Sequence, residues 1–172
     1  MVAPGRPLAN RHYVADGGLA KVLAQIIPDG SSVIDIGAGI GQYQVWFMNN
    51  NKNFSRYLAY DGAPNVEAFT WGCVRYLNVA HLVHWYPHEI SDWVISLEVG
   101  EHIPKQFEST FIHNLHHVNR KGMILSWAII GQRGNGHVNC QSNEYIIKTV
   151  SELGYKYDEE SSKLCRESAQ YK

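Results

Sequence analysis

The stretch SSVIDIGAGIGQY, residues 31–43, restricts the fold more than any other part of the chain. It places three glycines within five positions, directly after a short apolar run. The run SVIDI is rich in β-branched residues and is bounded by turn residues, which predicts a buried strand. Glycine adopts positive φ angles and lets another molecule approach the main chain. Gly37, Gly39 and Gly41 therefore predict a tight strand-to-helix turn with a ligand against its backbone.

Strands and helices alternate along the rest of the sequence. Further strands are predicted in four short apolar or β-branched runs, at residues 56–61, 74–79, 92–99 and 122–130. Apolar residues at helical spacing predict helices at residues 18–27, 42–50, 107–118 and 142–154, and a short one ends at Phe69. Such alternation favours parallel strands joined by helical crossovers. We expect an α/β fold, a Rossmann-like open and mostly parallel sheet with helices on both faces.

Length and charge exclude several classes of protein. A chain of 172 residues suits one domain, so residues 1–172 are expected to form a single unit. The formal net charge of −1 supplies no basic field, and we expect no nucleic-acid partner. The sequence has no apolar run of about 20 residues and no signal-peptide pattern. A cytoplasmic protein without a membrane partner is therefore the expectation.

Spacing narrows the ligand of the glycine turn. A dinucleotide-binding turn needs a third glycine at position 42, where this chain has Gln42, and the G-K-[ST] of a phosphate-binding P-loop is absent. Asp61 ends the second predicted strand, where a carboxylate can accept hydrogen bonds from the two hydroxyls of a ribose. The pattern predicts a ligand that carries a ribose but no pyrophosphate.

These motifs resemble those of the class I S-adenosylmethionine-dependent methyltransferases. VIDIGAGIG and YLAYDG are similar to the first two motifs of that superfamily, and DWVISLEVGEHIP resembles the fourth-strand motif of members that methylate small molecules. The resemblance covers residues 18 to 155. It implies S-adenosylmethionine as cofactor and methyl transfer to a small molecule or a protein side chain.

The resemblance also implies a cofactor site at the strand ends, with the N-terminal segment 1–17 lying over it. Its expected members are Tyr13, Asp35, Gly37, Gly39, Gly41, Asp61, Asn78, Val79, Leu97 and Glu98. The glycines would line the methionine part of the cofactor, Asn78 and Val79 the adenine, and Leu97 and Glu98 the sulfonium. Asp35 would organise the glycine loop or bind the cofactor's ammonium.

The expected catalytic residues are His102, His137 and Glu98. A sulfonium donor is already activated, so a base is needed only where the acceptor carries a proton. His102 follows the fourth strand and suits a base, although it can equally pin its loop. His137 lies in the glycine-rich loop 131–141, where it can orient an acceptor together with Asn139. Glu98 and Glu101 form a carboxylate pair of undecided role.

No metal site is expected from the sequence. His81, His84 and His88 have helical spacing, but Pro87 interrupts that helix, and surface histidines are the better interpretation. Two other functions stay open. One is a cofactor-binding scaffold without turnover, since no base is clear. The other is an aminopropyltransferase that uses decarboxylated cofactor.

The C-terminus departs from the superfamily, which usually ends with two antiparallel strands at the sheet edge. Here at most one strand is expected, at residues 155–158, so the antiparallel strands are short or incomplete. Residues 159–172 are expected to be disordered or to form a truncated edge. Because an open strand edge attracts pairing, a homodimer through this edge is one expectation.

Overall fold

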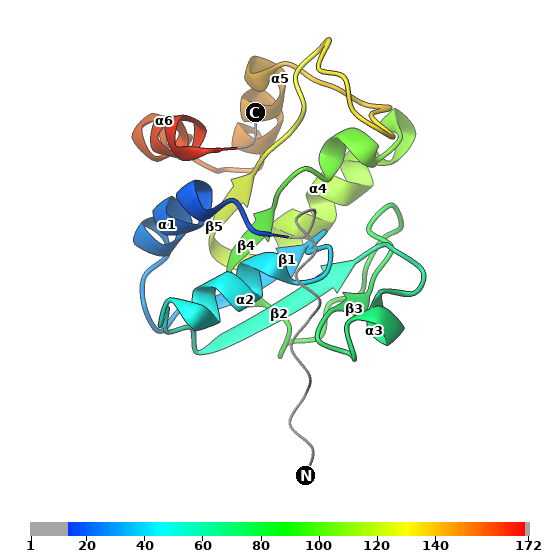
Figure 1. Cartoon of the computed structure of the whole chain (residues 1–172). Helices are drawn as coiled ribbons and strands as arrows, with labels where there is room; N and C mark the ends of the chain where they lie inside the picture. The colour runs from blue at the N-terminus through cyan, green and yellow to red at the C-terminus, as the bar shows by residue number, and fades with distance from the viewer. Residues whose placement is uncertain (1–13, 171–172) are drawn as a thin grey trace.

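Five parallel strands form the centre of the molecule (Figure 1). The computed structural model describes residues 14–170, so Tyr13 and the segment before it lie outside the described residues. The strands are β1 (Ser32–Ile36), β2 (Arg56–Asp61), β3 (Arg75–Tyr76), β4 (Ser91–Ser96) and β5 (Asn119–Leu125). Their order in the sheet is β3-β2-β1-β4-β5, and every pair is parallel. This arrangement confirms the predicted open α/β sheet.

Helices cover both faces of the sheet. One face carries α1 (Gly17–Ile26), α2 (Gln42–Asn49) and α6 (Glu159–Ser168), and the other α4 (Glu108–His117) and α5 (Asn143–Ser151). Short helices α3 (Val66–Phe69), η1 (Gly100–His102) and η2 (Lys105–Phe107) lie in the connections. Successive side chains of β1 point to opposite faces, so Val33 packs in the core with α1 and α2, whereas Ile34 packs with α4.

Three predicted strands have different ends in the structure. β3 is only two residues long, because it pairs with β2 only at Arg75 and Tyr76. β4 and β5 end together at the paired residues Ser96 and Leu125, short of the predicted residues 99 and 130. Beyond Ser96 the chain turns away, since Glu98 adopts a φ of 58°, which a strand cannot accommodate. The ends of these strands are therefore set by partner strands and by one turn.

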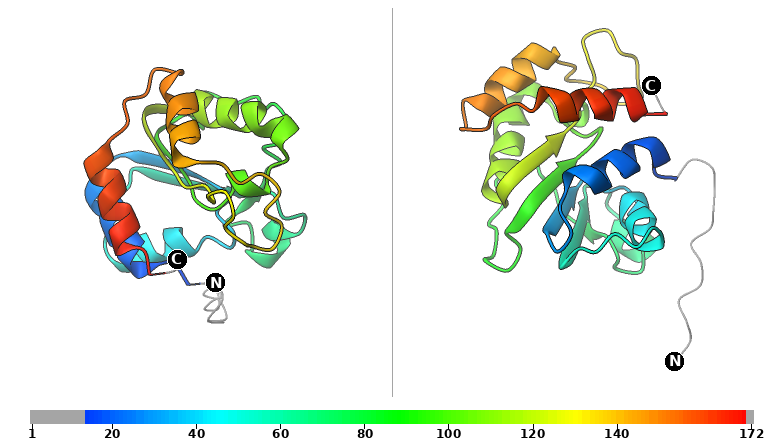
Figure 2. Two further views of the ribbon diagram at one scale, coloured as in Figure 1. Left: turned by 90° about the horizontal axis from the view of Figure 1, so that it is seen from above. Right: turned by 90° about the vertical axis from the view of Figure 1, so that its left-hand side faces the viewer.

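The C-terminal segment is helical where disorder or a truncated edge was expected. Residues 155–158 form no strand, and residues 159–168 form helix α6 instead of a disordered or truncated edge. The Asp158 carboxylate caps this helix by accepting a hydrogen bond from the Ser161 N–H at 3.0 Å. Cys165 packs against the core under α1, and α6 lies beside α1 (Figure 2). Within residues 14–170 the sheet has no antiparallel strand.

The contact between α1 and α6 can be tested at two adjacent glycines. A Cβ on Gly18 would overlap the main-chain oxygen of Ser168, whereas a Cβ on Gly17 would meet Trp46 at an ordinary 3.8 Å. We expect Gly18→Ala to lower the free energy of unfolding by about 1 to 2 kcal/mol, because α6 must move away. Gly17→Ala should leave it unchanged or raise it by up to about 1 kcal/mol through helix propensity. Urea denaturation measures both, and equal effects would contradict this packing.

Candidate functional site

A cavity of about 440 Å³ opens at the carboxyl ends of β1, β2 and β4. Ligands of open α/β sheets bind at the topological switch point, where the strand order reverses direction. Here the order runs from β1 through β2 to β3 on one side and from β1 through β4 to β5 on the other, so the switch point lies at β1. The residues that line the cavity are Ile36, Gly37, Asp61, Gly62, Leu77, Asn78, Val79, Ala80, Glu98, Val99, His102, Ile103 and Pro104. The cavity therefore lies where the motifs of the sequence predicted a ligand.

The glycine loop between β1 and α2 needs its glycines. Gly37, Gly39 and Gly41 have φ angles of 82°, 58° and 82°, in the left-handed region that side chains disfavour. The N–H groups of Gly37 and Ala38 both donate to the Tyr60 carbonyl, at 2.8 and 2.9 Å. A Cβ on Gly37 would also overlap the side chain of Val99, beside the cavity. The main chain of the loop is thus held tightly against β2, and Gly37 is half-buried and lines the cavity.

Asp61 holds the glycine loop from the end of β2. One carboxylate oxygen accepts a hydrogen bond from the Gly39 N–H at 2.8 Å, and the other accepts one from the Ala63 N–H at 2.8 Å. Each carboxylate oxygen can accept a second hydrogen bond. Asp61 is only half-buried and lines the cavity, so these free acceptor positions are open to hydroxyl groups of a ligand.

The other expected cofactor residues divide into two groups. Asn78, Val79 and Glu98 line the cavity, whereas Asp35 and Leu97 do not. Leu97 packs against the core under α1 and α2. Asp35 is 3% exposed, and its carboxylate accepts a hydrogen bond from the Tyr57 hydroxyl at 2.8 Å. Burial raises the pKa of Asp35 to about 7. The partner of Asp35 in the described structure is thus Tyr57, not the glycine loop.

The expected catalytic residues lie together at the rim of the cavity. Glu98 and His102 follow β4 in the chain and line the cavity. The loop after β5 places His137 beside His102. The centroids of the His102 and His137 rings are 5.1 Å apart. The Glu98 carboxylate accepts a hydrogen bond from the Ser126 hydroxyl at 2.7 Å, which fixes its direction. Sequence reasoning missed Ile103 and Pro104 as lining residues, although both belong to the fourth-strand motif DWVISLEVGEHIP.

Glu101 is the unusual member of this region. Its side chain is fully buried, and neither carboxylate oxygen has a hydrogen-bond partner among residues 14–170. Burial raises the pKa of Glu101 to about 7, and the neighbouring Glu98 carboxylate raises it too, while His137 opposes the shift. The main-chain oxygen of Glu101 accepts hydrogen bonds from the N–H groups of Val138 and Asn139, at 2.9 and 3.0 Å. These two bonds tie the loop after β5 to the Glu101 turn.

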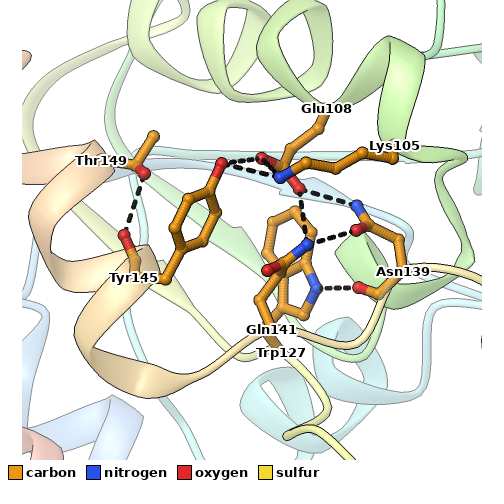
Figure 3. A network of polar contacts seen from close by, with 7 residues as sticks. All are labelled: Lys105, Glu108, Trp127, Asn139, Gln141, Tyr145 and Thr149. Carbon is orange, nitrogen blue, oxygen red and sulfur yellow. Dashed lines mark hydrogen bonds and ion pairs between the residues drawn. The ribbon is translucent and has the colours of Figure 1, made fainter.

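A buried polar network anchors the same loop on α4 (Figure 3). Glu108 is its centre, and it accepts hydrogen bonds from Lys105 at 2.7 Å, Tyr145 at 2.6 Å and Asn139 at 2.8 Å. The indole N–H of Trp127 donates to the Asn139 carbonyl at 2.6 Å. Asn139, which the sequence suggested for orienting an acceptor, is 5% exposed and outside the cavity lining. Its position in the structure is that of a support for the loop that carries His137.

The network predicts an acid-sensitive contribution to stability. Burial alone would raise the pKa of Glu108, but the hydrogen bonds from Lys105, Tyr145 and Asn139 lower it overall. The folded pKa then lies below the unfolded value of about 4.3, so the contribution is complete above that pH and is lost as the pH falls through the folded pKa. We expect Glu108→Gln to show a smaller loss of thermal stability than wild type between pH 6 and 3. Parallel acid profiles of the two proteins would contradict this role.

Comparisons with known proteins add the following. No model of a protein family matches the chain, and no curated protein matches its sequence. Among the described residues no helix is long and apolar enough to cross a membrane. The chain is, however, similar in structure to solved proteins.

Three of these structures illustrate the likeness. An S-adenosylmethionine-dependent methyltransferase from Aquifex aeolicus has a TM-score of 0.59 at 15% identity over 80% of this chain and 79% of its own. The 1,6-didemethyltoxoflavin-N1-methyltransferase of Burkholderia thailandensis, solved with 1,6-didemethyltoxoflavin and S-adenosylhomocysteine, has a TM-score of 0.57 at 15% identity over 81% of this chain and 68% of its own. The [4+2]-cyclase SpnF has a TM-score of 0.59 at 14% identity over 80% and 57%. At such identities the likeness shows the fold, which is that of the class I methyltransferases.

Proposed function

We propose that this chain binds S-adenosylmethionine and transfers its methyl group. The observation that carries the proposal is the cavity at the end of β1, which Gly37 of the glycine loop and the carboxylate of Asp61 both line. Two of the similar structures support it, because one is an S-adenosylmethionine-dependent enzyme and the other holds S-adenosylhomocysteine. The lack of the third glycine of a dinucleotide turn, at Gln42, favours this cofactor over NAD.

In this proposal the cofactor follows the rim of the sheet. Asp61 accepts hydrogen bonds from the ribose hydroxyls through its free acceptor positions, and Asn78 and Val79 flank the adenine. The methionine part lies along the glycine loop. Glu98 borders the sulfonium. Asp35 and Leu97 do not line the cavity, so in this proposal they support the site and do not contact the cofactor.

The acceptor then approaches from the side of η1 and the loop after β5. The bound sulfonium supplies an activated methyl group, and the chain's main task is to hold the acceptor in line with it. Glu98, His102 and His137 border this side, and one of these three side chains can accept a proton from a protonated acceptor. We propose a small molecule or a protein side chain as acceptor. The toxoflavin methyltransferase, solved with a small-molecule substrate, supports the first.

Two further parts of the proposal concern the cellular location and the oligomeric state of the protein. A cytoplasmic setting is proposed from the sequence pattern alone. A homodimer through β5 is proposed because, among the described residues, β5 has a partner strand on one side only. Sedimentation at several protein concentrations decides between dimer and monomer.

The test of turnover is methyl transfer from labelled S-adenosylmethionine to small-molecule and protein fractions of a cell lysate. We expect labelled product with wild type and a loss of at least about tenfold in rate for His137→Asn, with cofactor affinity nearly unchanged. Cofactor binding without any labelled product would favour the inactive scaffold. SpnF shows that this fold also occurs in a protein described as a cyclase, so fold alone does not settle turnover.

A further inference from the structure

Three side chains at the rim of the cavity are close enough to share one metal ion. Glu101, His102 and His137 each offer one ligand atom, and these atoms lie within 4.8 Å of one another. The first two belong to the η1 turn, and the third comes from the loop after β5. It is the one such group of histidine, cysteine and carboxylate side chains found within residues 14–170.

The buried carboxylate of Glu101 independently points to a cation. The side chain has 0% exposure, and neither oxygen has a hydrogen-bond partner among the described residues. An ionised carboxylate that makes no hydrogen bond is costly to bury, because its lost hydration is not replaced. The nearby carboxylate of Glu98 adds further negative charge instead of relieving it. A bound cation would compensate both effects.

The two imidazoles are oriented as metal ligands usually are. Nδ1 of His102 lies 3.1 Å from the Gly136 carbonyl, and Nδ1 of His137 lies 3.3 Å from the Gln132 carbonyl. A carbonyl can only accept, so each ring carries its proton on Nδ1 and keeps a free lone pair on Nε2. Metal-binding histidines commonly donate their second N–H in this way, which fixes the ring and its tautomer.

Two glycines of the loop make room for these rings. A Cβ on Gly134 would overlap the His137 ring, and a Cβ on Gly136 would lie 3.1 Å from Nδ1 of His102. Gly136 also has a φ of 78°, which a side chain would strain. In the motif GNGH, residues 134–137, both glycines are therefore needed for steric reasons. Their lack of side chains allows His137 to reach the η1 turn.

We propose that Glu101, His102 and His137 bind one divalent transition-metal ion of the zinc class. Two imidazoles and one carboxylate suit such ions, whereas Mg²⁺ prefers oxygen ligands. Three protein ligands leave a tetrahedral ion one open position, next to the cavity that His102 lines. A ring whose Nε2 binds the ion cannot accept a proton there, so in this assignment His102 and His137 are ligands and not bases. The metal site does not rest on the proposed methyl transfer.

The test is calorimetric titration of the tag-free, chelator-treated chain with Zn²⁺, and separately with Mg²⁺. We expect one equivalent of Zn²⁺ per chain and no binding of Mg²⁺ at the same concentrations. Glu101→Gln and His137→Asn should each weaken Zn²⁺ binding by at least about tenfold, the scale at which even outer-shell changes act. His84→Asn is the matched control, because His84 is exposed and outside the cluster, and it should bind as wild type does.

Each other outcome overturns the assignment. Absence of Zn²⁺ binding, or equal affinity in wild type and His137→Asn, would show that this cluster holds no ion, and equal affinity for Mg²⁺ would refute the metal class. Circular dichroism shows whether the Glu101→Gln protein folds. If it does not, the Zn²⁺ affinity of His137→Asn, whose substitution lies in an exposed loop, tests the metal site by itself. Titration of the same samples with S-adenosylmethionine separates the two proposals, since zinc binding without cofactor binding overturns only the function and the reverse overturns only the metal site.

Discussion

Replacing Gly37 by alanine lowers the free energy of unfolding by about 2 to 5 kcal/mol, the largest effect expected of a single substitution at the candidate site. Gly37 has a φ of 82°, and a side chain in this left-handed region costs about 1 to 2 kcal/mol. The new Cβ would also overlap the Val99 side chain, and overpacking of this kind costs about 1 to 3 kcal/mol. Urea denaturation measures the sum.

Gly30 provides a matched control for this prediction. Its φ is 79°, close to that of Gly37, but a Cβ there would meet no atom within 4 Å. Gly30→Ala should therefore pay only the backbone strain of about 1 to 2 kcal/mol. An equal loss in both variants would show that the contact with Val99 contributes nothing. Because Val99 lines the cavity, a displaced Val99 should also weaken cofactor binding in Gly37→Ala alone.

Replacing Asp61 by alanine is expected to weaken S-adenosylmethionine binding by about 1.5 to 3 kcal/mol, which corresponds to roughly 10- to 150-fold in affinity. A hydrogen bond to a charged group contributes this much, and here the carboxylate can bond the ribose while it still accepts from the N–H groups of Gly39 and Ala63. Titration calorimetry of the two proteins measures the change.

Two further variants show where the lost affinity comes from. Asp61→Asn keeps one acceptor oxygen but no charge, so its affinity should lie between those of wild type and Asp61→Ala. Asp29→Ala removes an exposed aspartate that pairs with Lys52 at 2.7 Å, away from the cavity, and should bind as wild type does. Unchanged affinity in Asp61→Ala would place the ribose somewhere else.

The centre of the fold was predictable because its signals are local. β1, the glycine loop and α2 follow one another within residues 32–49, and the positive φ angles of the loop are a property of glycine itself. Strand ends were less predictable, because the ends of β3, β4 and β5 depend on partner strands far away in the sequence. Helix α6 carries a local signal in its Asp158 cap, but the alternating YKYD before it suggested a strand.

The candidate site was predictable to the extent that it follows the strand ends. Asp61, Asn78, Val79, Glu98 and His102 were named from motifs, and all of them line the cavity. The roles of these residues remain predictions. The approach of His137 to Glu101 could not be predicted, because it depends on the path of the loop after β5 and on its anchor at Glu108. The same holds for the isolation of the Glu101 carboxylate, which is a property of packing and not of spacing.

The most direct measurement for the central claim is titration calorimetry of the purified chain with S-adenosylmethionine and, in parallel, with NAD. The Asp61 carboxylate, placed to bind a ribose, and Gln42 at the position where a dinucleotide-binding turn has glycine predict binding of S-adenosylmethionine and no binding of NAD. The expected dissociation constant for S-adenosylmethionine is in the micromolar range, about −8 kcal/mol. Binding of NAD with no response to S-adenosylmethionine would contradict the proposed function and leave only the fold.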